Sequence, residues 1–139
     1  MKKEIKNYAV KNHIKNFKER CGLPSERIDT SILKEVSLLL PKHHLPEISG
    51  RVDSIETNGF AVETDSYYPR KSFYRVSIIY SGNIPEEKRE DKKHGFFFRN
   101  ATVHYDEDLN FIEVQPHHNQ SDYNWADYFS KFKEIFANL

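Results

Sequence analysis

Three residues in the second half of the chain have the side-chain types that acid–base chemistry on a phosphate requires. Arg75, His104 and Glu113 each lie in a stretch where apolar and polar residues alternate. Such alternation is typical of strands, whose successive side chains point to opposite faces of a sheet. We expect all three on the polar face, where Glu113 and His104 could move protons and Arg75 could stabilise negative charge. The other polar residues predicted for that face are Ser77, Asn100, Thr102 and Gln115.

The histidines also offer metal-ligand chemistry, because His43-His44 and His117-His118 form two adjacent pairs. Neighbouring side chains diverge, so each pair supplies one ligand more easily than two. One histidine from each pair with a carboxylate could bind zinc, but no H-x-x-x-H or C-x-x-C spacing is present. The single Cys21 excludes an intramolecular disulfide and a cysteine metal cluster. We therefore expect no metal and no cofactor, and we interpret the histidine pairs as loop residues.

A third group of residues suits the recognition of another protein. Aromatic residues and arginine are enriched at the energetic centres of protein interfaces. One segment of this type is expected in a loop between strands, and an acidic run is expected in a later turn. The binding candidates are Tyr67, Tyr68, Arg70, Asp106, Glu107 and Asp108.

Three phenylalanines fall on the polar parity of the strands and would be exposed there: Phe73, Phe96 and Phe98. One alternative is therefore a homodimer that covers these side chains through that face. Another alternative is that the bases of a single-stranded nucleic acid stack on these rings. The balanced charge does not favour nucleic acid as the partner.

The elements that would position these residues begin with two helices. Residues 3–20 have helical periodicity, with Val10, Ile14, Phe17 and Cys21 predicted on the buried face. A second helix is expected from Ser25 or Thr30 to Leu40, where Pro41 stops it. A last helix begins near Ser121 or Asp122, and its core stripe is Trp125, Phe129, Phe132 and Phe136.

Between the helices the periodicity changes to two. Asn58-Gly59 predicts a tight hairpin of the strands 51–57 and 60–64, with Thr57 opposite Phe60 and Ile55 opposite Val62. Further strands are expected over 72–81, 95–105 and 111–115. The residues predicted to face the helices are Tyr74, Val76, Ile78, Tyr80, Ala101, Val103, Tyr105, Ile112 and Val114. The order predicts an α+β fold with two N-terminal helices, an antiparallel sheet of about five strands and a C-terminal helix packed on it.

Composition agrees with one domain over residues 1–139. Aromatic residues make up 14% of the chain, so a core of few large side chains is expected. Basic and acidic residues number 21 each, which argues against a strongly basic nucleic-acid binder. The charge is segregated, because residues 1–20 hold seven bases and two acids whereas residues 101–139 hold two bases and seven acids. With no apolar leader and no long apolar run, we expect a cytoplasmic protein without a membrane partner.

Two resemblances frame the function. A single small domain, rich in aromatic residues and lacking a catalytic motif, resembles the stand-alone immunity proteins that neutralise bacterial toxins. That resemblance implies a tight complex with a toxin domain and no turnover. Arg75, His104 and Glu113 on an open antiparallel sheet are similar in architecture and residue type to metal-independent ribonucleases of the barnase and RelE-like group. The leading hypothesis is therefore a protein-binding module, and the alternative is a small ribonuclease.

Overall fold

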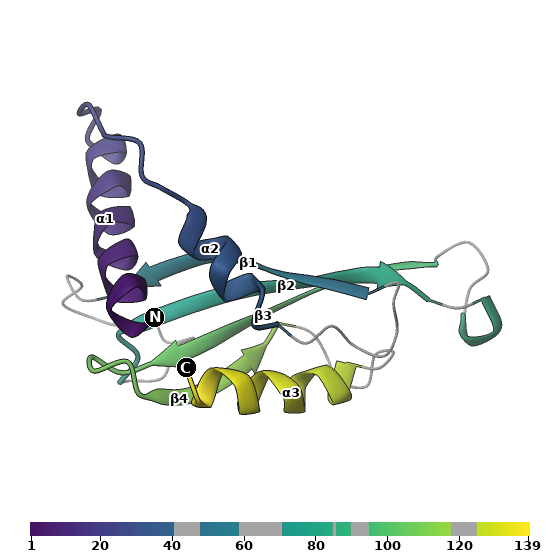
Figure 1. Ribbon diagram of the computed structural model, residues 1–139. Coiled ribbons are helices and arrows are strands. Elements are labelled where there is room, and N and C mark those ends of the chain that lie inside the picture. The colour runs from purple at the N-terminus through teal and green to yellow at the C-terminus, as the bar shows by residue number, and fades with distance from the viewer. Residues whose placement is uncertain (41–47, 59–70, 85, 90–94, 118–124) are drawn as a thin grey trace.

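The computed structural model describes residues 1–40, 48–58, 71–84, 86–89, 95–117 and 125–139. Within them an antiparallel sheet is accompanied by helices from both ends of the chain, which confirms the α+β class (Figure 1). The elements in chain order are α1 (Lys2–Arg20), α2 (Ser31–Ser37), β1 (Ile48–Thr57), β2 (Tyr74–Asn83), the 3-10 turn η1 (Glu86–Lys88), β3 (Phe96–Tyr105), β4 (Phe111–Pro116) and α3 (Trp125–Ala137).

The described sheet has four strands in the order β1-β2-β3-β4, fewer than the five predicted. β1 pairs with β2, so that Ile55 lies opposite Val76 and Thr57 lies opposite Tyr74. The predicted partners, Val62 and Phe60, lie outside the described residues. The hairpin at Asn58-Gly59 therefore stays a prediction, and the pairing of β1 with β2 is a further contact that the sequence reasoning did not contain.

One face of the sheet carries the core, as the alternation predicts. The buried residues of β2 are Tyr74, Val76, Ile78 and Tyr80, and those of β3 on this face are Ala101, Val103 and Tyr105. α3 covers them with Phe129, Phe132 and Phe136, and the rings of Tyr80 and Phe132 lie 4.6 Å apart between centroids. The hydroxyl of Tyr105 donates to the carbonyl oxygen of Phe136 at 3.2 Å, which attaches the end of α3 to the sheet.

Register irregularities correct two details of the predicted faces. The pairing of β3 with β4 shifts after His104, so Phe111 lies opposite Tyr105 and packs against the core. Ile112, which was predicted to face the helices, is only half-buried and is not part of that core. A second irregularity in β1, between Val52 and Ser54, brings both Val52 and Ile55 to the core face.

The N-terminal helices differ most from prediction. α1 buries Ile5 and Ala9, while Ile14 and Phe17 of the predicted core stripe are exposed. Cys21, at the end of that stripe, is exposed as well. Figure 1 shows that α1 rises away from the sheet toward its C-terminal end. The middle of the helix still contacts β1, because the side-chain amide of Asn12 donates to the carbonyl oxygen of Ile55 at 3.3 Å.

α2 is also shorter than expected. Hydrogen bonds of the i→i−3 type at Leu39 and Leu40 replace the α-helical pattern after Ser37. The side chain of Ser37 accepts a hydrogen bond from the backbone N–H of Val52 at 2.7 Å and so attaches α2 to β1.

Candidate functional site

A row of polar residues crosses the second face of the sheet, the face opposite the core. The register aligns Glu56 of β1 with Arg75 of β2, Arg75 with His104 of β3, and His104 with Glu113 of β4. The three residues that alternation predicted to share a face therefore share a single cross-strand row. Glu56 joins them because β1 pairs with β2, a long-range contact that the hairpin prediction did not contain.

His104 is the most enclosed member of this row, with a relative exposure of 0%. Its Nδ1 atom lies 2.8 Å from the hydroxyl oxygen of Ser72, which is itself buried. The pKa of His104 is lowered to about 4, mainly by burial and to a smaller extent by the charges of Arg75 and His117, while a hydrogen bond with Gln115 opposes the shift. The imidazole is consequently neutral at pH 7 and does not contact solvent in this structure.

The neighbouring positions extend this polar network. The hydroxyl of Thr102 lies 2.7 Å from Nε2 of His117, and the side-chain amide of Gln115 donates to Glu113 Oε1 at 2.8 Å. Within the described residues, His, Cys, Asp and Glu side chains do not gather into a group of three or more that could hold a metal ion. His43, His44 and His118 lie outside those residues.

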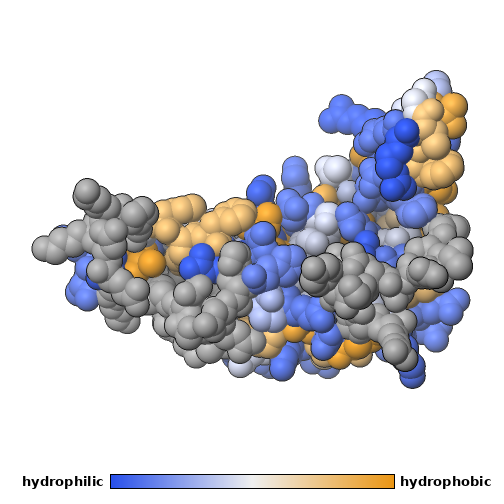
Figure 2. Space-filling model, turned by 180° about the vertical axis from the view of Figure 1, so that it is seen from behind, coloured by the Kyte–Doolittle hydropathy of each residue, from blue (hydrophilic) through white to orange (hydrophobic). Residues whose placement is uncertain are grey.

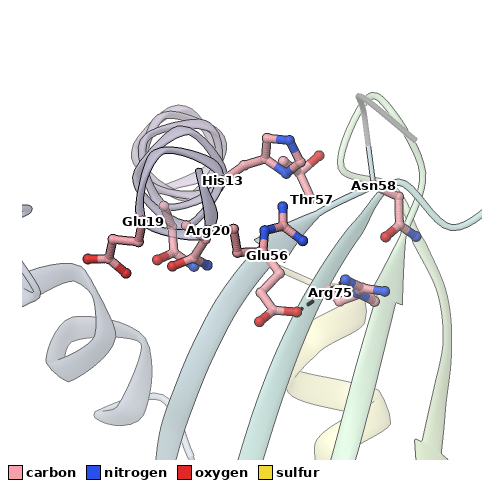
Figure 3. Close-up of a pocket in the computed structure, with 9 residues that line it drawn as sticks. His13, Glu19, Arg20, Glu56, Thr57, Asn58 and Arg75 are labelled. Carbon is pink, nitrogen blue, oxygen red and sulfur yellow. Dashed lines mark hydrogen bonds and ion pairs between the residues drawn. The ribbon is translucent and has the colours of Figure 1, made fainter. Parts of the chain in front are cut away.

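A pocket of about 670 Å³ opens between α1 and the end of the β1–β2 pair. In Figure 3, His13 extends from α1 over the end of β1, while Glu56 and Arg75 project toward each other from neighbouring strands. The α1 residues that line the pocket recur at intervals of three, four and seven, which places them on one side of a helix. The lining residues are Asn12, His13, Asn16, Glu19, Arg20, Glu56, Thr57, Asn58 and Arg75.

Ion pairs organise the charges of this pocket. Arg75 donates to Glu56 Oε2 at 3.1 Å, and its side chain is only 16% exposed whereas that of Glu56 is 43% exposed. The carboxylate of Glu19 accepts hydrogen bonds from Lys15 at 2.6 Å and Ser25 at 3.2 Å, and the bond from Lys15 is the main cause of its lowered pKa. Both carboxylates thus have cationic or hydroxyl partners, and the lining also contains His13 and Arg20.

Among the described residues, the binding candidates Asp106, Glu107 and Asp108 do not line the pocket. Tyr67, Tyr68 and Arg70 lie outside the described residues. Asp106 shapes the β3–β4 turn, since its Oδ1 atom accepts hydrogen bonds from the backbone N–H groups of Asp108 at 2.9 Å and Asn110 at 2.8 Å. These bonds lower the pKa of Asp106, with the Asn110 contact as the largest cause. Glu107 and Asp108 are exposed in the same turn.

Exposed apolar residues mark a second feature, which we call the α1 tip. It comprises the apolar Ile14, Phe17 and Leu23, which are 44%, 53% and 53% exposed, and the basic Lys15 and Lys18 between and beside them. Figure 2 shows the projecting helix at the upper right, with hydrophobic and hydrophilic side chains next to each other. Helical periodicity alone assigned Ile14 and Phe17 to the core and so missed this surface. To predict that Ile14 and Phe17 are exposed, one would also need to know at which residue α1 leaves the sheet.

A groove of about 320 Å³ runs beside the α1 tip, between α1 and the segment 26–29. Its lining combines Ile14 and Ile28 with the basic side chains of Lys11, Lys15, Lys18 and Arg27 and the acidic side chains of Glu26 and Asp29. Apolar residues with a charged rim are typical of surfaces that bind proteins.

No helix in the described part of the chain has the length and apolar character needed to cross a membrane. Comparison with known proteins adds no assignment: this chain matches no family model, no curated protein and no solved structure.

Proposed function

We propose that this protein is a binding module that docks an acidic protein partner on the α1 tip, as an immunity-type inhibitor docks a toxin. The observation that carries the proposal is the exposure of Ile14 and Phe17 on a helix that rises from the sheet, and of Leu23 directly after that helix. Exposed apolar residues cost solvation free energy, which binding of a partner recovers. Five bases on α1 follow its first turn, against the single acid Glu19, and these charges favour an acidic partner.

The partner is expected to present an apolar side chain to the 320 Å³ groove and carboxylates to the surrounding lysines. Such electrostatic complementarity mainly accelerates association, so the association rate should fall as salt screens the charges. The apolar contacts at Phe17 and Ile14 should instead determine the dissociation rate, because anchors of this kind supply most of the binding free energy.

Phe17→Asp tests this surface. We expect it to weaken the affinity for the captured partner at least about 30-fold, because loss of an interface anchor typically costs 2 kcal/mol or more. The measurement begins with affinity capture from a lysate and identification of a stoichiometric partner. Titration of the purified partner against the wild type and the variant follows.

Phe96→Asp is the matched control, because Phe96 is 63% exposed but lies on β3, away from the α1 tip. The proposal requires that this control binds as the wild type does and that both variants keep the wild-type unfolding temperature. Equal binding by Phe17→Asp and the wild type would overturn it. So would the absence of any stoichiometric protein partner.

A second candidate function is the ribonuclease, which the register of Arg75, His104 and Glu113 favours. Metal-independent RNA cleavage needs a base, an acid and a cation beside one phosphate. In the row itself, the buried imidazole of His104 does not reach solvent. The same three types of group also occur in the pocket beside α1, where Glu56 is open to solvent.

A further inference from the structure

We infer that the pocket between α1 and β1–β2 binds a phosphodiester of single-stranded RNA and cleaves it by transesterification. The inference rests on the second candidate function and places its chemistry in the pocket, with different residues from those the sequence predicted. It is independent of docking on the α1 tip, so the two can fail separately.

The size and lining of the pocket suit such a ligand. A volume of about 670 Å³ lies within the range of pockets that hold small molecules, and a nucleotide is a ligand of this class. The described lining residues are all polar, and three of them, Asn12, Asn16 and Asn58, carry amides. Amides donate and accept hydrogen bonds and can therefore bind a ribose or a base edge.

Arg75 is the phosphate-binding group that the structure organises best. Its guanidinium is held by Glu56 at 3.1 Å and is largely buried, so it has little conformational freedom left to lose when a phosphate binds. A guanidinium in this position can stabilise the charge that develops on the phosphoryl oxygens. Arg20, on the opposite wall, supplies a second permanent cation.

Glu56 and His13 supply the two proton transfers. The carboxylate of Glu56 accepts the proton of the ribose 2′-hydroxyl, and the 2′-oxygen attacks the neighbouring phosphorus. The bond from phosphorus to the 5′-oxygen breaks, and the side chain of His13, as the general acid, gives that oxygen a proton. The products are a 2′,3′-cyclic phosphate and a free 5′-hydroxyl, with no metal, water or redox partner consumed.

The test is cleavage of an end-labelled single-stranded RNA oligonucleotide by the purified protein in the presence of a metal chelator. We expect fragments that end in a 2′,3′-cyclic phosphate, and no cleavage of the DNA oligonucleotide of the same sequence, which lacks the 2′-hydroxyl. Glu56→Gln and His13→Ala should each lower the rate at least about 100-fold, since one general acid or base typically contributes this much.

Arg51→Ala is the matched control for these variants, because Arg51 is exposed on β1 and does not line the pocket. It should cleave RNA at the wild-type rate after the same purification. A wild type that does not cleave RNA overturns the inference, as does cleavage that survives in both Glu56→Gln and His13→Ala. If His104→Ala lowers the rate of RNA cleavage and the pocket variants do not, the reaction takes place at the cross-strand row and the inference is wrong. Partner binding by Glu56→Gln should equal that of the wild type, which separates this inference from the proposed function.

Discussion

Phe132→Ala is expected to lower the free energy of unfolding by about 3–5 kcal/mol, the range typical of a buried phenylalanine truncated to alanine. The side chain is 0% exposed, and its ring lies 4.6 Å from that of Tyr80 between centroids. Truncation therefore removes a large apolar contact and leaves a cavity between α3 and the sheet. A domain of this size typically has 5–15 kcal/mol of stability, so the variant should be marginal. Urea denaturation followed by far-UV circular dichroism measures the loss.

Phe96→Ala provides the comparison, because it makes the same chemical change at a side chain that is 63% exposed. It should change the free energy of unfolding by less than about 0.5 kcal/mol, as most surface substitutions do. Similar losses for the two variants would show that α3 does not pack on the sheet as described.

The sheet and α3 could be predicted from the sequence because their patterns of apolar residues are local and each pattern allows only one face to be buried. The alternation from Tyr74 to Tyr80 allows one buried face only, since a shift of one residue would expose every apolar side chain. The stripe of Phe129, Phe132 and Phe136 likewise allows only one face of a helix to be buried. These elements pack against each other in the structure as predicted.

α1 and the first strand pairing could not be predicted in the same way. Helical periodicity locates an apolar face but does not say how far along the helix a sheet covers it, so Phe17 and Ile14 were assigned to the core. The Asn58-Gly59 turn signal likewise says nothing of β2, whose pairing with β1 is a long-range contact. Both the position where α1 leaves the sheet and the pairing of β1 with β2 depend on contacts between residues distant in the chain, whereas the hairpin at Asn58-Gly59 stays a prediction.

The candidate site likewise contains residues that local patterns predict and residues that only long-range contacts bring together. Arg75, His104 and Glu113 could be placed on one face by parity alone, and the register then aligned them. Burial of His104 could not be foreseen, because parity does not report what covers a face. Glu56 and His13 gave no local signal either, since a helix and a strand distant in sequence bring them to one pocket.

Mild acid is expected to destabilise this protein through His104. Its pKa lies near 4 in the folded protein, mainly because of burial, against about 6.5 for an ordinary histidine. Between these values the unfolded chain binds a proton that the folded chain does not, so the contribution of His104 is complete above pH 6.5 and is lost as the pH falls toward 4. The shift corresponds to about 3 kcal/mol, since one pKa unit is worth about 1.4 kcal/mol. Urea denaturation at pH 7 and at pH 4.5 measures the difference.

His104→Gln should remove most of this pH dependence. The prediction concerns the change in the free energy of unfolding between pH 7 and pH 4.5 within each protein, so the two proteins can differ in stability at pH 7. The lowered pKa values of Glu19, Asp29 and Asp106 also make the protein sensitive to acid, but at lower pH and equally in both proteins. The difference between the wild type and His104→Gln therefore isolates the buried imidazole. If both proteins lose the same free energy of unfolding between pH 7 and pH 4.5, His104 is not buried as a neutral side chain, and the polar row is open to solvent. That result would make His104 accessible to a substrate and would favour the row over the pocket for RNA cleavage.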